Sequence, residues 1–273
     1  MKHLSLFMLF AALLTQPAAA HEFWMTAQPF TVREGDATRL SLHVGEHFEG
    51  TPVGFSAGHA ASMRKYSTSA TTDLGAQLPS DAAAQYFLLP SLPAGNHVIT
   101  YDSRTSTITL SADKFHAYLH EEGLDKIIRQ REAAGTAQLP GRERYRRHVK
   151  TILQAGGASD QAYARRTGQR LEILPLANPY EKAAGDRLAF RLYFDGRPLA
   201  GALLKAWHRG DGETFIIRAV TNTSGEVNLS LPYGGVWMLS TVHMLAAAGT
   251  DGIDWDSFWG NLSFALPDRR TRP

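Results

Sequence analysis

Single polar residues separate hydrophobic ones in short runs over residues 21–110. Leu40, Leu42 and Val44 show this spacing, which is typical of a strand with one buried face. Turn signals such as Glu34-Gly35-Asp36 separate the runs, and no helical spacing intervenes. The pattern therefore predicts an antiparallel β-sandwich over this region.

The pattern changes over residues 111–168, where charged residues are frequent and apolar residues recur at helical spacing. Phe115 and Leu119 predict the buried face of one helix. A later helix is predicted by apolar residues at the same kind of spacing, namely Tyr145, Val149, Ile152 and Leu153. The basic residues from Arg142 to Lys150 would lie on the solvated face of that helix. We expect this region to form a helical insert.

Alternation returns over residues 169–273. Asp195-Gly196 is a residue pair that favours a two-residue hairpin turn. A further strand is predicted by residues that share one side of it, namely Trp237, Leu239, Thr241 and His243. The region resembles a small prealbumin-like sandwich. The sequence thus predicts a mainly β protein, with two antiparallel β-sandwich domains of Ig-like or prealbumin-like type and a helical insert between them.

Residues 1–20 have the organisation of a secretory signal peptide. A short basic start is followed by the apolar stretch Leu4–Leu14, and Ala18 and Ala20 fit the small-residue positions before a cleavage site. Cleavage after Ala20 would make His21 the first residue of a periplasmic protein of a Gram-negative bacterium. The apolar stretch is too short to span a bilayer, and no candidate transmembrane segment follows it.

Composition narrows the chemistry that the chain can perform. Its 273 residues include no cysteine, which excludes disulfides, thiolate metal ligands and a thiol nucleophile. The formal net charge of +2 gives no indication of a nucleic-acid partner. No nucleophile elbow, zinc-protease helix or phosphate-binding glycine loop occurs, so these enzyme signatures are absent.

A histidine at a free N-terminus carries two nitrogen donors, the α-amine and the imidazole Nδ1. Both can bind one metal ion in a chelate ring, because the α-amine has a pKa near ~8 and a metal can displace its proton. Such donors suit Ni(II), Co(II), Cu(II) or Zn(II), whereas calcium requires oxygen ligands. We therefore expect His21 to be a transition-metal ligand.

Internal histidines are candidates for completing such a site. On a regular strand His43 and His47 would lie ~13 Å apart at ~3.3 Å per residue, so one metal ion cannot bind both. A bulge or strand end at Gly45 could instead turn His47 toward a site. His243 lies near the end of a predicted strand, where it is either a ligand or a core-edge histidine with one hydrogen bond.

Several stretches resemble the bacterial domain-of-unknown-function family 4198. They are His21-Glu22-Phe23-Trp24, Val44-Gly45-Glu46-His47-Phe48, Pro140-Gly141-Arg142-Glu143-Arg144-Tyr145, and Asp254-Trp255 with Phe258-Trp259. The resemblance covers essentially the whole chain after residue 20. Some relatives are described as periplasmic components associated with nickel or cobalt uptake. The resemblance therefore implies a periplasmic metal-binding protein, with His21, His47 and His243 as the ligands.

Three functions are compatible with these observations, in decreasing order of preference. The first is capture of nickel, cobalt or copper in the periplasm and its delivery to a membrane transporter or an outer-membrane receptor. The second is a docking module that binds no metal, because fold alone does not decide function. The third is a copper oxidase or monooxygenase, since a terminal histidine with a second histidine also forms the copper brace of lytic polysaccharide monooxygenases.

Overall fold

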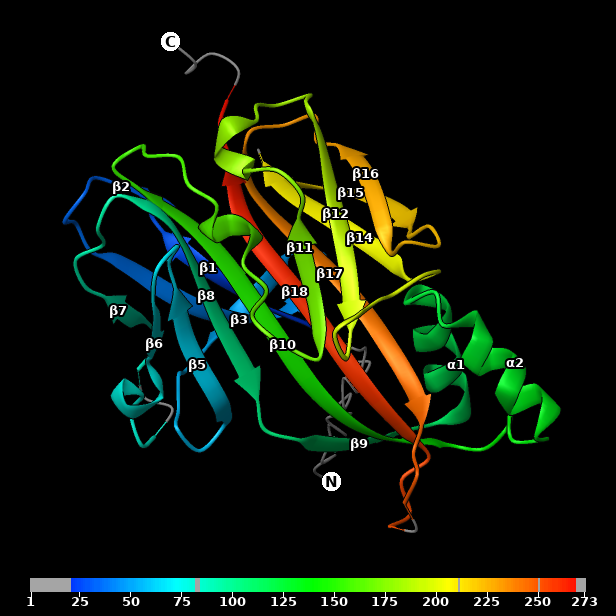
Figure 1. Cartoon of the computed structure of the whole chain (residues 1–273). Helices are drawn as coiled ribbons and strands as arrows, with labels where there is room; N and C mark the ends of the chain where they lie inside the picture. Colours follow the sequence, from blue (N-terminus) through cyan, green and yellow to red (C-terminus); the bar gives the residue numbers. More distant parts are fainter. Residues whose placement is uncertain (1–20, 82–83, 211, 250, 269–273) are drawn as a thin grey trace, which may run out of the picture.

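Strands form three sheets in the computed structural model, which describes residues 21–81, 84–210, 212–249 and 251–268 (Figure 1). The predicted signal peptide, residues 1–20, lies outside the described residues. The prediction of a mainly β protein built from β-sandwiches is confirmed. None of the helices in the described part of the chain is long and apolar enough to cross a membrane.

A long sheet of ten strands runs through the described part of the molecule. Its main path, in spatial order, is β15 (Glu213–Val220), β14 (Leu203–Gly210), β17 (Gly235–Ala246), β18 (Trp255–Leu266), β10 (Gly141–Ala155), β8 (Gly95–Ser103), β5 (Ala60–Tyr66) and β6 (Thr71–Asp73). Two further strands pair with β10, namely β2 (Thr31–Val32) and β9 (Ser106–Leu110). β10 runs parallel to β18 and to β2, and the other pairs in this sheet are antiparallel.

Two smaller sheets pack on opposite faces of the long sheet. The N-terminal sheet consists of β1 (Glu22–Gln28), β3 (Thr38–Glu46), β4 (Glu49–Val53) and β7 (Phe87–Leu89). The C-terminal sheet consists of β11 (Leu171–Pro175), β12 (Arg187–Phe194), β13 (Arg197–Pro198) and β16 (Glu226–Ser230). Neighbouring residues of a strand face opposite ways. Val149 and Leu153 of β10 accordingly belong to the core of the N-terminal sheet, and Ile152 belongs to the core of the C-terminal sheet.

Two helices cover the other end of the face that carries the N-terminal sheet. They are α1 (Ala112–Glu121) and α2 (Asp125–Ala133). Phe115 and Leu119 are buried, as predicted, and they share a core cluster with Val242 and Met244 of β17. The α-helical part of the predicted insert is therefore limited to these two helices and the short link between them.

The prediction of a helix with Tyr145, Val149, Ile152 and Leu153 on one face is wrong, because these residues belong to strand β10. Residues 141–155 form a strand of 15 residues in the long sheet. Most of its second half is buried on both faces, so its apolar residues are not confined to alternate positions and mimic helical spacing. Nor do its basic residues form a solvated helix face. Arg142 pairs with Asp254 at 2.7 Å, and Arg144 pairs with Asp256 at 2.6 Å.

The long sheet joins strands from all three predicted regions. β5, β6 and β8 come from residues 21–110, whereas β14, β15, β17 and β18 come from residues 169–273. β10, from the predicted insert, lies between these two groups. The hairpin at Asp195-Gly196 and the alternating strand that contains His243 are confirmed as the β12–β13 turn and β17.

Candidate metal site at the start of β1

His21 lies at an exposed edge, immediately before β1. Glu22 pairs with Gly45 in the β1–β3 register, so His21 lies beside Glu46, the last residue of β3. The distance from His21 Nε2 to Glu46 Oε1 is 3.8 Å, and both side chains are about two-fifths exposed. An imidazole and a carboxylate thus meet at the position where the sequence predicts the mature N-terminus.

His47 occupies a two-residue turn that joins β3 to β4. Glu46 pairs with Glu49, and the residues between them, His47 and Phe48, have positive φ angles of 53° and 60°. Positive φ at both positions is the signature of a type I′ turn, which normally contains Asn-Gly or Asp-Gly. Without glycine this backbone conformation costs about 1–2 kcal/mol per residue. β3 pairs regularly through Gly45, so the turn itself, and no bulge, directs His47.

Packing holds the strained turn in place. The Thr214 hydroxyl donates a hydrogen bond to the carbonyl oxygen of His47 at 2.9 Å. The His47 ring centroid lies 5.8 Å from the ring of Trp207, and the Phe48 ring lies edge-on to Trp24 at 5.5 Å. Contacts from β14 and β15 therefore keep His47 against the part of the long sheet that also carries the start of β1.

Glu22, the residue after His21, is buried and fixed by two partners. Its Oε1 lies 2.8 Å from Lys205 Nζ and accepts a hydrogen bond from the Ser240 hydroxyl at 2.7 Å. The indole N–H of Trp207 donates to the same hydroxyl oxygen at 3.1 Å. Because Lys205 and Ser240 belong to β14 and β17, these contacts attach the first residue of β1 to the long sheet.

Lys205 is shared by two buried carboxylates. Its Nζ lies 2.6 Å from Glu122 Oε1 as well as 2.8 Å from Glu22. Burial lowers the pKa of Lys205, but the two carboxylates outweigh this effect and raise the pKa above its usual value. Burial raises the pKa of Glu122 to about 8, despite the attraction of Lys205. Glu122 follows α1 directly, so Lys205 links the helices to the start of β1.

His243, the third predicted ligand, lies on the opposite face of the long sheet. Ser240 faces Glu22, and residues an odd number of positions apart along a strand point to opposite faces. The His243 ring packs on Phe194 of the C-terminal sheet, with ring centroids 4.3 Å apart. Burial lowers its pKa to about 4. The structure therefore places the backbone of His21 and of His47 next to Glu46 at one edge of the N-terminal sheet, and it leaves His243 on the opposite face of the long sheet.

His43 is part of the packing beside this region. Its ring stacks on Trp24 at 5.4 Å, and its Nε2 is 3.0 Å from the hydroxyl oxygen of Thr26. Burial lowers its pKa. Within the described residues, no group of three or more His, Asp or Glu side chains is placed to hold a metal ion.

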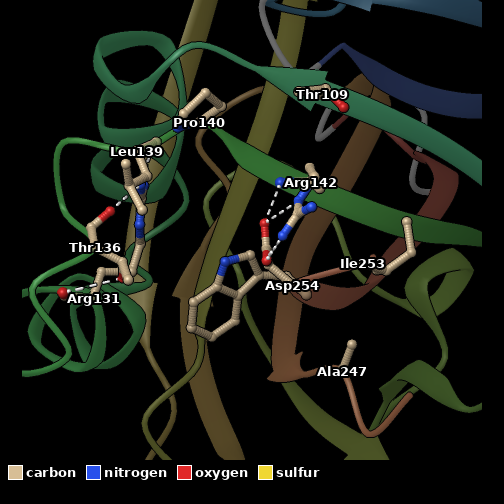
Figure 2. Close-up of a pocket in the computed structure, with 10 residues that line it drawn as sticks. Thr109, Arg131, Thr136, Leu139, Pro140, Arg142, Ala247, Ile253 and Asp254 are labelled. Atoms are coloured by element: carbon tan, nitrogen blue, oxygen red, sulfur yellow. Dashed lines mark hydrogen bonds and ion pairs between the residues drawn. The ribbon is translucent and has the colours of Figure 1, made fainter. Parts of the chain in front are cut away.

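A separate cavity of about 610 Å³ lies beside the helices (Figure 2). Its wall includes Asp254, which accepts hydrogen bonds from Arg142 Nε at 3.0 Å and from Arg142 NH2 at 2.7 Å. Arg131 donates to the carbonyl oxygens of Thr136 and Leu139. The arginines of this cavity are thus held by partners within the protein.

Glu46, Lys205 and Glu122 are the residues of this region that sequence reasoning missed. Glu46 stands in the stretch Val44–Phe48 on which the family resemblance depends, so its place beside His47 was a usable signal. Lys205 and Glu122 are far from residue 21 in sequence, and no local pattern indicates that they meet.

Solved structures of low similarity match the chain. The D0-D1 domain of intimin is 10% identical, with a TM-score of 0.21 and coverage of 89% of this chain and 97% of that one. Trypsin-activated alpha-2-macroglobulin from Escherichia coli is 10% identical, with a TM-score of 0.23. That match covers 92% of this chain but only 16% of the macroglobulin chain. At these TM-scores the likeness supports no conclusion about function.

No curated protein matches the chain significantly. A protein-family profile does match, and it covers residues 18–245, which include His21, His47 and His243. That family is described as "Domain of unknown function (DUF4198)". Since the match extends over most of the sequence, the chain belongs to the DUF4198 family.

Proposed function

We propose that this protein binds a transition-metal ion through the α-amine and imidazole of His21, once residues 1–20 have been removed. The nitrogen donors suit Ni(II), Co(II) or Cu(II). The proposal places the protein in the periplasm, where it would capture the metal and deliver it to a membrane transporter or an outer-membrane receptor.

The observation that carries the proposal is the pairing of His21 with Glu46. The carboxylate lies 3.8 Å from Nε2 of the imidazole. Metal-binding histidines usually donate a hydrogen bond to such a carboxylate from the ring nitrogen that does not bind the metal. Because 3.8 Å is longer than a hydrogen bond, we propose that Glu46 moves closer to Nε2 when the metal binds. Nδ1 is then left free, and Nδ1 is the nitrogen that can close a chelate ring with the α-amine of the same residue.

His47 supports the proposal as a further nitrogen donor. Its side chain is exposed, and it lies one residue beyond Glu46. Backbone strain of this kind persists only where the surrounding structure enforces it, and it is concentrated at functional sites. The strained turn is thus consistent with selection for the direction of the His47 imidazole.

The buried anchor of Glu22 supports the proposal through rigidity. A metal site requires donors held in a fixed geometry by neighbouring residues. Glu22 is held by Lys205 and Ser240, so the backbone that leads to His21 starts from a fixed point. His243 is not part of the proposed site, because it faces the C-terminal sheet.

The test is a calorimetric titration with Ni(II) of two chains that differ by one residue. One begins at His21, and the other has a single glycine before His21, which converts the amine into a peptide nitrogen. We expect the extended chain to bind about 100-fold more weakly or worse, because loss of a donor should exceed the 10–100-fold typical of outer-shell changes. Equal affinities would refute the proposal.

Two single substitutions in the chain that begins at His21 provide the matched control. His47→Ala should weaken Ni(II) binding, because it removes a nitrogen donor beside His21. His243→Ala removes the same side chain from the opposite face and should leave the affinity unchanged. A loss of affinity in His243→Ala would contradict the exclusion of His243 from the site.

A further inference from the structure

A second site of a different chemistry lies inside the N-terminal sandwich. A cavity of about 400 Å³ opens between the N-terminal sheet, the end of β8 with the loop that follows it, and the middle of β10. Its apolar wall includes Phe23, Leu42 and Tyr101, and its polar wall includes Arg104 and Arg147. A volume of this size falls within the range of small-molecule sites.

Within the described chain the guanidinium of Arg147 forms no direct ion pair, although Glu143 and Glu22 lie close enough for their charges to act on its pKa. No carboxylate of the described residues lies within ion-pair distance of its guanidinium, and none of the described residues accepts a hydrogen bond from it. The guanidinium carbon lies 4.8 Å from the ring centroid of Phe23 and 5.0 Å from that of Tyr145. Burial lowers the pKa of Arg147, but a guanidinium remains charged at any physiological pH.

The rest of the lining contains no opposite charge. None of the described residues that line the cavity is Asp or Glu, and Arg104 adds a second guanidinium at its rim. The hydroxyl groups of Ser103, Thr105 and Ser106 also line it, besides that of Tyr101. The cavity beside the helices differs in this respect, because its Arg142 is paired with Asp254 (Figure 2).

We propose that this cavity binds a small organic carboxylate. Its carboxylate group would accept hydrogen bonds from Arg147 and Arg104, and its carbon skeleton would pack against Phe23 and Tyr101. The apolar wall favours an organic anion over an inorganic one, since a bare phosphate would leave that wall without contacts. The proposal is independent of metal binding at His21.

The test is a ligand-observed NMR titration with benzoate, with neutral benzamide and inorganic phosphate titrated in parallel. We expect benzoate to bind saturably, and both benzamide and phosphate to bind at least tenfold more weakly. Arg147→Met keeps the packing of the side-chain stem and should weaken benzoate binding tenfold or more, because it removes charge-assisted hydrogen bonds. Arg104→Met changes an exposed residue and should also weaken binding, so the test does not depend on how Arg147→Met folds.

Arg129→Met is the matched control, because it removes an exposed arginine of α2 and the same net charge. It should leave benzoate binding unchanged. Absence of saturable benzoate binding, or equal binding of benzamide, would overturn the proposal. Tighter binding of phosphate than of benzoate would overturn the assignment of an organic ligand. An equal loss in Arg129→Met would show that only net charge matters and would overturn the site.

Discussion

Each face of the long sheet buries a lysine, but the two lysines have different numbers of charged partners. Beneath the C-terminal sheet, Lys150 and Arg166 share the single carboxylate of Glu172, at 2.6 Å and 2.9 Å. Beside the start of β1, Lys205 forms ion pairs with two carboxylates, those of Glu22 and Glu122. The first arrangement holds the pKa of Glu172 at about 2, where its cationic partners and hydrogen bonds outweigh burial. The second leaves the pKa of Glu122 at about 8.

The hairpin turns of the two regions also differ, in how well their residues suit a positive φ angle. The turn of the C-terminal sheet uses Asp195-Gly196, the kind of pair that a type I′ turn prefers. The turn of the N-terminal sheet holds His47 and Phe48 at positive φ. One region thus has a fully paired carboxylate and a favourable turn, whereas the other has a carboxyl group with a raised pKa and a strained turn next to the proposed metal site. Such a contrast is expected where function opposes stability.

The largest expected effect comes from removing each lysine. Lys205→Met should lower the free energy of unfolding by about 3–5 kcal/mol, because it leaves Glu22 and Glu122 buried without a cation. Lys150→Met should cost less, about 1–3 kcal/mol, because Glu172 keeps Arg166 and the donors of Thr167. Urea unfolding at pH 7 measures both. Equal losses would show that charge balance does not distinguish the regions.

The second effect is a dependence of stability on pH. The pKa of Glu122 is raised from its usual 4.5 to about 8, so between these values the folded chain binds a proton that the unfolded chain does not. The contribution of Glu122 to stability therefore falls as pH rises from 4.5 to 8, by at most about 1.4 kcal/mol per pH unit. Above pH 8 it is constant.

Glu122→Gln isolates this slope. His243, with a pKa lowered to about 4, contributes a slope of opposite sign between that value and its usual 6.5, so the wild type alone is ambiguous. The difference in unfolding free energy between wild type and Glu122→Gln should fall steadily from pH 5 to pH 8. A flat difference would contradict the buried, shared lysine. Glu172 should act only on the acid side, as pH falls from 4.5 toward 2.

A smaller effect is expected on metal affinity. Glu22→Gln should weaken Ni(II) binding by the chain that begins at His21 about tenfold, because it loosens a support of the donor residue. Glu172→Gln, measured where both variants are folded, should leave the affinity within about twofold. If both substitutions weaken Ni(II) binding equally, the anchor has no specific role.

The smallest effect concerns the two turns. His47→Asn should raise the free energy of unfolding by about 0.5–1 kcal/mol, because asparagine tolerates positive φ better. The reciprocal change, Asp195→His, should lower it by a similar amount. Thermal unfolding of both variants compares them directly. Destabilisation by His47→Asn would show that the contact with Trp207 outweighs backbone strain.

Local sequence patterns predicted the parts of the fold that depend on neighbouring residues. The alternation around His243 and the Asp195-Gly196 turn are local signals, and both are confirmed. The apolar residues of β10 predict a helix wrongly, because a strand covered on both faces has no alternation in its apolar residues. Its basic residues do alternate, at Arg142, Arg144 and Arg146, and that period of two was the signal to follow.

The candidate site was only partly predictable for a related reason. His21 directly precedes β1 and His47 directly follows β3, two strands of one antiparallel pair, and both residues stand in stretches that carry the family resemblance. The sequence does not show to which face His243 points, because one residue of register decides that. The contacts of Lys205 with Glu22 and Glu122 join distant segments, so only the tertiary structure reveals them.

The most direct test of the account is an NMR spectrum of the imidazole groups in the chain that begins at His21, recorded before and after addition of one equivalent of diamagnetic Zn(II). We predict that the ring signals of His21 and His47 shift together, while those of His243 stay in place. Shifts at His243 without shifts at His21, or no shift at any histidine, would contradict a metal site at the mature N-terminus.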